Sequence, residues 1–118
     1  MAGYVIHTPD GLSPAARDRA AELGPTYVTA SAVPGMLARQ VGFEVIECRD
    51  MTAEFRATSV AFLRAMSEIE PELRAEEGDA YFEEERAAEE MTLTGIDEGL
   101  LLRSMVIAVK PYQATPAA

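Results

Sequence analysis

The side chains that could carry out acid–base chemistry at neutral pH include a single histidine, His7. It lies near the end of a short apolar run, residues 3–8, which predicts a strand that stops at Pro9, Asp10 and Gly11. An imidazole titrates near neutral pH, so His7 could serve as a general base or orient a substrate hydroxyl group. No acidic partner for it can be identified in the sequence. The alternative is a structural histidine that hydrogen-bonds to the backbone.

The single cysteine, Cys48, excludes an internal disulfide and a cysteine-only metal site. Because there is only one histidine as well, the sequence predicts no metal centre and no Ser-His-Asp triad. Cys48 lies within an apolar strand pattern, so we expect it to be a small buried hydrophobic residue. The alternative, a nucleophilic thiolate, would need a nearby base or cation, and only Arg49 is adjacent in the sequence.

Acidic residues concentrate in residues 68–98, which hold thirteen of them and two arginines. Helical carboxylates could bind a metal ion, but helical di-metal sites also use histidines, and this segment has none. We interpret it as a solvated helix face, with a basic partner protein as the alternative. A net charge of −10 for the whole chain argues against nucleic-acid binding.

The composition predicts one globular region over residues 1–111 and a tail over residues 112–118, since 48% of the 118 residues are hydrophobic and 25% are charged. No apolar run approaches the roughly 20 residues that span a membrane, and no signal peptide is visible. We therefore expect a soluble, cytoplasmic protein that makes no membrane contact. The nine arginines against one lysine are typical of a GC-rich bacterial coding sequence.

Proline and glycine, which break helices and strands, and hydroxyl residues, which cap helices, divide the rest of the chain into short elements. Ser13, Ser31 and Thr52 are expected to cap helices, and Pro71 is expected to restart or kink a helix. We expect, in chain order, a strand over 3–8, a helix over 14–23, an extended or loop segment over 26–31, a helix over 32–41, a strand over 43–49, helices from 52 to the break at 78–79 and from 80 to 98, and a strand over 100–110.

The long helices carry an apolar stripe that predicts packing against the sheet. The residues expected to face the sheet are Phe55, Phe62, Met66, Phe82 and Met91, with Tyr81 and Ile96 also inward. Some of the same side chains could instead line a pocket over a substrate. At helical spacing, a plain hydrophobic core is the commoner explanation.

Three segments together resemble the late part of class I S-adenosylmethionine-dependent methyltransferases. Residues 36–52 give a helix, a Gly42-Phe43 pair, a strand and a turn with an acidic residue and threonine. Residues 99–111 give an apolar strand that ends at Lys110-Pro111, and residues 3–9 match the strand that follows the cofactor-binding half. The resemblance covers residues 2–111 but only the C-terminal part of the family's domain.

The resemblance implies a fold of the α/β class, a partial Rossmann-like sheet of three strands with about four helices. Residues 43–49 would form the outer strand, residues 102–109 an antiparallel strand beside it, and residues 3–8 the next strand inward. It also implies the acceptor side of methyl transfer to an oxygen, nitrogen or carbon nucleophile of a small molecule. The candidate substrate-binding residues are His7, Thr8, Phe62, Met66, Tyr81 and Phe82, and His7 is the candidate catalytic residue.

The family's cofactor-binding elements are missing from this sequence. No Gly-x-Gly occurs, and neither does the ribose-binding acid that follows the family's second strand. We therefore expect no cofactor to bind this chain alone, and S-adenosylmethionine only if another segment supplies the first half of the sheet. Such a complementary methyltransferase segment is one expected partner.

The other expected partner is a second copy of the chain, because the strand over residues 3–8 would lack a neighbour on one side. Its edge is apolar and carries no lysine or proline that would block pairing. A non-catalytic module that self-associates and binds a ligand or protein is thus the alternative to the methyltransferase-like function. A monomer in which residues 25–31 or the C-terminal tail cover this edge is also left open.

Overall fold

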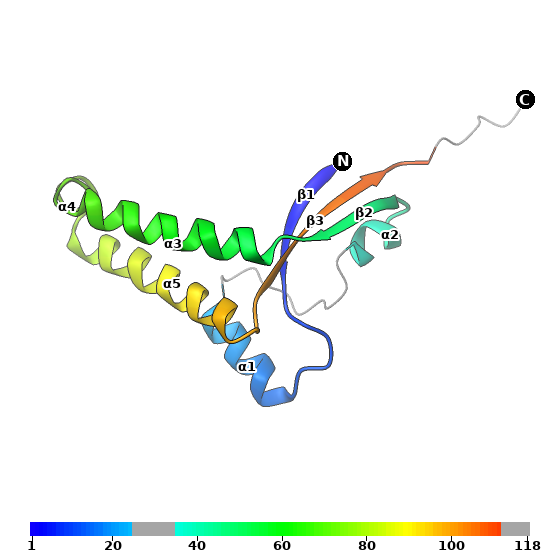
Figure 1. The fold of residues 1–118 in the computed structure, drawn as a ribbon, viewed down its shortest axis with the longest axis horizontal. Coiled ribbons are helices and arrows are strands. Elements are labelled where there is room, and N and C mark those ends of the chain that lie inside the picture. The colour runs from blue at the N-terminus through cyan, green and yellow to red at the C-terminus, as the bar shows by residue number, and fades with distance from the viewer. Residues whose placement is uncertain (25–34, 112–118) are drawn as a thin grey trace, which may run out of the picture.

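The computed structural model describes residues 1–24 and 35–111, and this part of the chain combines a small sheet with a long helical hairpin (Figure 1). The expectations for residues 26–31, for a cap at Ser31 and for the tail lie outside the described residues. The elements are β1 (Ala2–His7), α1 (Pro14–Leu23), α2 (Met36–Gln40), β2 (Glu44–Asp50), α3 (Thr52–Glu68), α4 (Glu70–Glu77), α5 (Asp79–Asp97) and β3 (Leu102–Val109). The fold is therefore of the α/β class.

The sheet has three strands in the order β1-β3-β2, and β3 is antiparallel to both neighbours. β1 and β2 therefore run parallel to each other. This confirms the prediction that the last strand is antiparallel. Alternate residues of β3, namely Ser104, Val106 and Ala108, are buried, as expected for a strand with one well-covered face.

The long helices α3 and α5 pack against each other, joined by α4, and extend away from the sheet (Figure 1). Only their base reaches the strands, where Phe55, Ile96 and Leu101 form a core with Ile6. The prediction that the whole apolar stripe packs on the sheet is wrong. The hairpin buries its own central residues and leaves Phe62 47% exposed.

The close packing at the base of the hairpin requires a glycine in α5. A Cβ atom at Gly95 would lie 2.5 Å from Leu101 Cδ1, so this position has no room for a side chain. Leu101 is fully buried as a result. Next to it, Ala20 and Leu23 of α1 form a second core with Leu100.

The helix ends follow the sequence signals in two of three cases. Ser13 Oγ accepts a hydrogen bond from the Ala16 N–H at 3.1 Å, and α4 begins with Pro71 in its first turn, as predicted. The predicted cap at Thr52 is wrong, because Thr52 is the first residue of α3. Its N–H donates instead to Asp50 Oδ1 at 3.1 Å, so the carboxylate at the end of β2 satisfies this helix start.

Among the helices of residues 1–24 and 35–111, none has both the length and the apolar character needed to cross a membrane.

Candidate functional site

The carboxyl ends of β1 and β2 lie at the same end of the sheet, because the two strands are parallel. His7 is the last residue of β1 and Thr8 follows it at this end, and Asp50 and Thr52 lie where β2 passes into α3. Ser104 of β3 pairs with Val5 on one side and with Asp50 on the other. In open α/β sheets this end collects ligands, so we take it as the candidate site.

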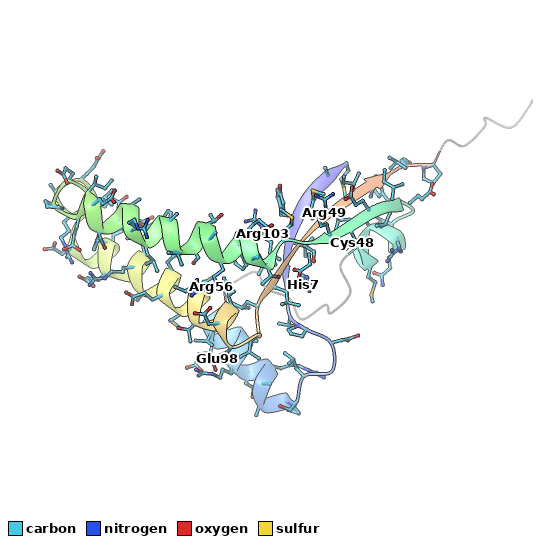
Figure 2. All side chains as sticks on the ribbon, viewed as in Figure 1. His7, Cys48, Arg49, Arg56, Glu98 and Arg103 are labelled. Atoms are coloured by element: carbon cyan, nitrogen blue, oxygen red, sulfur yellow. The ribbon has the colours of Figure 1, made fainter. Side chains whose placement is uncertain are left out.

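His7 is held at both ring nitrogens (its position is labelled in Figure 2). Its Nε2 lies 2.9 Å from Ser104 Oγ, and its Nδ1 lies 3.3 Å from the Thr8 carbonyl oxygen. A carbonyl oxygen only accepts, so Nδ1 is the donor in that contact, and Nε2 shares the second hydrogen bond with the serine hydroxyl group. His7 and Ser104 are 5% and 4% exposed. In this arrangement the imidazole has no free nitrogen for a substrate, which favours the structural alternative.

A second set of hydrogen bonds joins the end of β2 to β3. Thr52 Oγ1 accepts from the Arg103 N–H at 3.2 Å, and the Met51 N–H donates to the Arg103 carbonyl oxygen at 2.7 Å. Asp50 accepts from both the N–H and the hydroxyl group of Thr52. These contacts fix the direction in which α3 leaves the sheet.

Arg103 is the charged side chain that sequence reasoning missed at this end (Figure 2). Its guanidinium carbon lies 4.3 Å from the Tyr4 ring centroid and 5.7 Å from that of Phe55. It forms no salt bridge with a carboxylate of the described residues. The only sequence signal was an arginine within a mostly apolar strand. A cation held over aromatic rings could receive an anionic group.

The other candidate residues lie on the hairpin, whereas His7 and Thr8 lie at the end of β1. Met66 and Phe82 are buried within the hairpin, and Phe62 and Tyr81 are about half exposed, at 47% and 50%. The structure therefore brings His7 and Thr8 together but does not bring the four hairpin residues to them.

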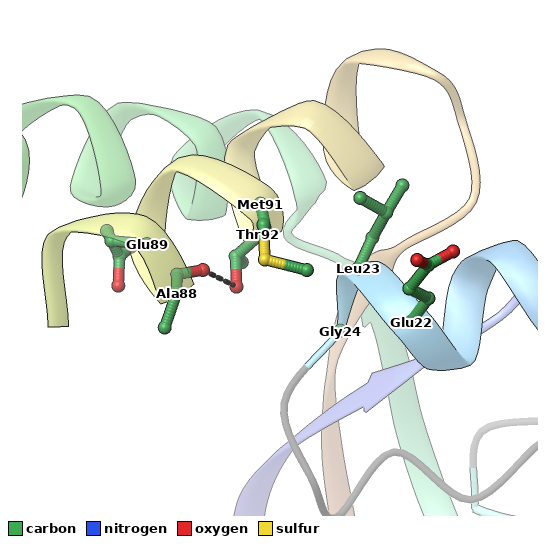
Figure 3. Close-up of a pocket in the computed structure, with 7 residues that line it drawn as sticks. All are labelled: Glu22, Leu23, Gly24, Ala88, Glu89, Met91 and Thr92. Carbon is green, nitrogen blue, oxygen red and sulfur yellow. Dashed lines mark hydrogen bonds between the residues drawn. The ribbon is translucent and has the colours of Figure 1, made fainter. Parts of the chain in front are cut away.

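A groove of about 400 Å³ lies between the end of α1 and the middle of α5 (Figure 3). Two of its polar groups are engaged: Glu89 accepts from Ser59 Oγ at 2.6 Å, and Thr92 Oγ1 donates to the Ala88 carbonyl oxygen at 3.0 Å. Sequence reasoning missed this groove because it joins segments far apart in the chain. The lining residues are Glu22, Leu23, Gly24, Ala88, Glu89, Met91 and Thr92.

The acidic hairpin is partly neutralised at its tip. Arg74 pairs with Glu70, Asp79 and Glu83, and its guanidinium carbon lies 4.4 Å from the Phe82 ring centroid. The Arg74 guanidinium group holds the pKa of the Glu83 carboxyl below its ordinary value. In residues 1–24 and 35–111, no group of three or more His, Cys, Asp or Glu side chains is arranged to hold a metal ion.

Cys48 is exposed, so the prediction that it is a buried hydrophobic residue is wrong. It lies on β2, an outer strand of the sheet, where the ladder slips between Val45 and Glu47. The strand predicted over residues 43–49 is an outer strand, as expected, but the apolar pattern around Cys48 did not show that its side chain is exposed there.

The chain matches no protein-family model and no curated protein sequence. The strand order and the contacts around His7 and Arg103 are therefore what bear on function.

Proposed function

We propose that this chain forms the acceptor side of a methyltransferase-type α/β domain that acts on a small molecule. One observation carries the proposal: β3 lies antiparallel between the parallel strands β1 and β2. This is the order that the resemblance to class I S-adenosylmethionine-dependent methyltransferases implies for the last three strands. The resemblance itself is drawn in part from Gly42-Phe43, which lies just before β2, and from Lys110-Pro111, which follows β3.

The residues present do not fit S-adenosylmethionine itself. In the resemblance β1 follows the cofactor-binding half, so the strand that would carry the glycine-rich turn has no counterpart among residues 1–24 and 35–111. β1 itself leads to α1 without such a turn, and Ser13 caps α1 with its own side chain. Pro14 removes the first N–H of that helix start. We therefore derive no methyl-transfer step through this chain, and the methyl donor would have to be held by another segment.

The proposed contribution of this chain is a surface for the methyl acceptor. The hairpin leaves the sheet at the carboxyl ends of β1 and β2, so it borders the end where a ligand would sit (Figure 1). Arg103 would orient an anionic group of the acceptor. His7 would keep the end of β1 in place through Ser104 rather than move a proton.

A fusion experiment tests this proposal. The cofactor-binding half of a class I methyltransferase, joined upstream of Met1, should unfold together with this chain in one cooperative transition and bind S-adenosylmethionine. The matched control carries Val106→Pro, which breaks the central strand and should abolish joint unfolding. Two independent transitions in the unmodified fusion, with cofactor binding unaffected by Val106→Pro, would contradict the proposal.

The second candidate function is a non-catalytic module that self-associates and binds a ligand or protein. It is favoured by the engagement of both His7 nitrogens, since the site then has no free general base. A fusion that binds the methyl donor but transfers no methyl group to any of a set of small nucleophiles would favour this candidate.

A further inference from the structure

The backbone groups of β1 divide into two sets. Met1 and Ala108 exchange both hydrogen bonds, at 2.7 and 2.9 Å. Hydrogen-bonded pairs recur at every second residue of an antiparallel ladder, so Gly3, Val5 and His7 also point their N–H and C=O groups toward β3. The corresponding groups of the alternate residues, Ala2, Tyr4 and Ile6, point away from β3. Within residues 1–24 and 35–111, no strand pairs with that outer edge.

The two outer edges of the sheet differ in their protection. β2 carries Glu44, Glu47, Arg49 and Asp50, and its ladder slips between Val45 and Glu47. Charges and bulges of this kind prevent further strands from adding. β1 has no charged residue and no proline, and its pairing with β3 is regular. Its Tyr4 and Val5 side chains are 57% and 40% exposed.

We propose that β1 pairs antiparallel with β1 of a second copy about a two-fold axis at Tyr4. In this register Tyr4 lies opposite Tyr4 of the second copy, and Ala2 lies opposite Ile6. Every outward N–H and C=O group of β1 then has a partner. An axis at Gly3 would leave the outward groups of Ile6 without a partner in β1, and an axis at Val5 would leave those of Ala2 without one.

The side chains are compatible with this pairing. Opposite residues share a face, so the two Tyr4 rings meet at the axis, where aromatic cross-strand pairs stabilise sheets. Each ring keeps its own Arg103 guanidinium group at 4.3 Å. β1 brings no charged side chain to the contact, although the chain carries a net charge of −10. The three strands of each copy would join into one continuous sheet of six.

The expected affinity is micromolar. A single pair of six-residue strands covers less than the roughly 1,600 Å² that standard stable interfaces bury. The inference does not rest on the proposed function, because it depends only on the edge of β1. The dimer would, however, occupy the edge that a complementary methyltransferase strand would use.

Light scattering on the full chain, from 10 to about 200 μM, tests the proposal. We expect the mass to rise with concentration toward twice 12.8 kDa. Tyr4→Pro removes an outward N–H and keeps the hydrogen bonds to β3, so it should weaken the dimer by more than about tenfold while circular dichroism stays unchanged. Tyr4→Phe is the matched control and should still dimerise. If Tyr4→Pro disturbs the fold, Tyr4→Lys gives the same test by placing charge at the axis.

Cysteine cross-linking tests the register, in a Cys48→Ser background. Tyr4→Cys should form a disulfide-linked dimer, because opposed residues of a hydrogen-bonded pair have Cα atoms about 5.5 Å apart. Val5→Cys should not, since Val5 lies opposite Gly3. A monomer at every concentration overturns the proposal and indicates that the edge is open or covered by the same chain. A dimer that Tyr4→Pro leaves unchanged overturns it in favour of another surface, and cross-linking of Val5→Cys alone overturns the register.

Discussion

The sheet and the α3–α5 hairpin bury their apolar residues in different ways. The hairpin packs Met66 and Phe82 between its own helices and turns its acidic side chains to water. The sheet has apolar residues on both faces of β1, and Tyr4 and Val5 are left largely exposed. The helical hairpin satisfies its backbone groups internally although it leaves Phe62 and Tyr81 about half exposed, whereas a strand that pairs on one side only still has backbone groups to satisfy. This difference locates the surface for a partner on the sheet.

The largest expected effect concerns two phenylalanines of the hairpin. Phe82→Ala should lower the free energy of unfolding by about 3–5 kcal/mol, because the ring is fully buried. Phe62→Ala should cost less than about 1 kcal/mol, because that ring projects from the hairpin. Urea unfolding measures both. Equal costs for the two variants would mean that the hairpin packs through Phe62 against something else.

A smaller effect on the free energy of unfolding should distinguish the residues of β1 whose backbone groups face β3 from those whose backbone groups face outward. Val5→Pro removes an N–H that faces β3 and should cost about 2 kcal/mol or more. Tyr4→Pro removes an outward N–H and should cost less than about 1 kcal/mol at concentrations where the chain is monomeric. Thermal unfolding at submicromolar concentration compares the two. A greater loss for Tyr4→Pro would reverse the assignment of inward and outward groups.

Smaller again is the expected effect of pH on the hairpin. Arg74 lowers the pKa of Glu83, so this carboxylate stabilises the fold above its ordinary pKa, and the stabilisation is lost as pH falls through the lowered value. Desolvation and the neighbouring Glu85 raise the pKa of Glu77, so its charge destabilises the fold at neutral pH and the penalty is relieved as pH falls.

The two substitutions should therefore have opposite signs. Glu83→Gln should lower the Tm at pH 7 and Glu77→Gln should raise it, and both differences should vanish near about pH 2. Glu84→Gln is a control on the same helix. Tm shifts of the same sign for Glu83→Gln and Glu77→Gln would show that total charge, not pairing with Arg74, governs the hairpin.

The smallest expected signal is the binding of S-adenosylmethionine to the chain alone. Calorimetry should detect no association, because the chain has no glycine-rich turn. A dissociation constant below about 100 μM, equivalent to roughly −5.5 kcal/mol, would contradict both this expectation and the assignment of the chain to the acceptor side.

The sequence predicted the strands and most helix limits, because turn residues such as Pro9 and Gly24 act locally. It did not predict what covers each apolar stripe. The apolar stripe through Phe62 has the same spacing whether α3 packs on a sheet or on another helix. The periodicity therefore could not distinguish these two packing arrangements. At the site, the position of His7 at the end of β1 was predicted. Its hydrogen-bond partner was not, because Ser104 lies 97 residues away in the sequence. Contacts of that span leave no local pattern.

Because Gly95 lies at the base of the hairpin, a small displacement of α5 there would be amplified along the length of the helix. α5 has 19 residues and is therefore about 28 Å long, while packed helices lie about 10 Å apart at the base. If a side chain at position 95 displaced α5 from Leu101 by about 1 Å over that base, the tip beside α4 would swing by about 3 Å. Small-angle scattering of Gly95→Ala would register such a swing as a change in the longest dimension, now 66 Å. The lack of a side chain at Gly95 would thus influence the position of the acidic tip, at the other end of a helix about 28 Å long, as well as the packing against Leu101.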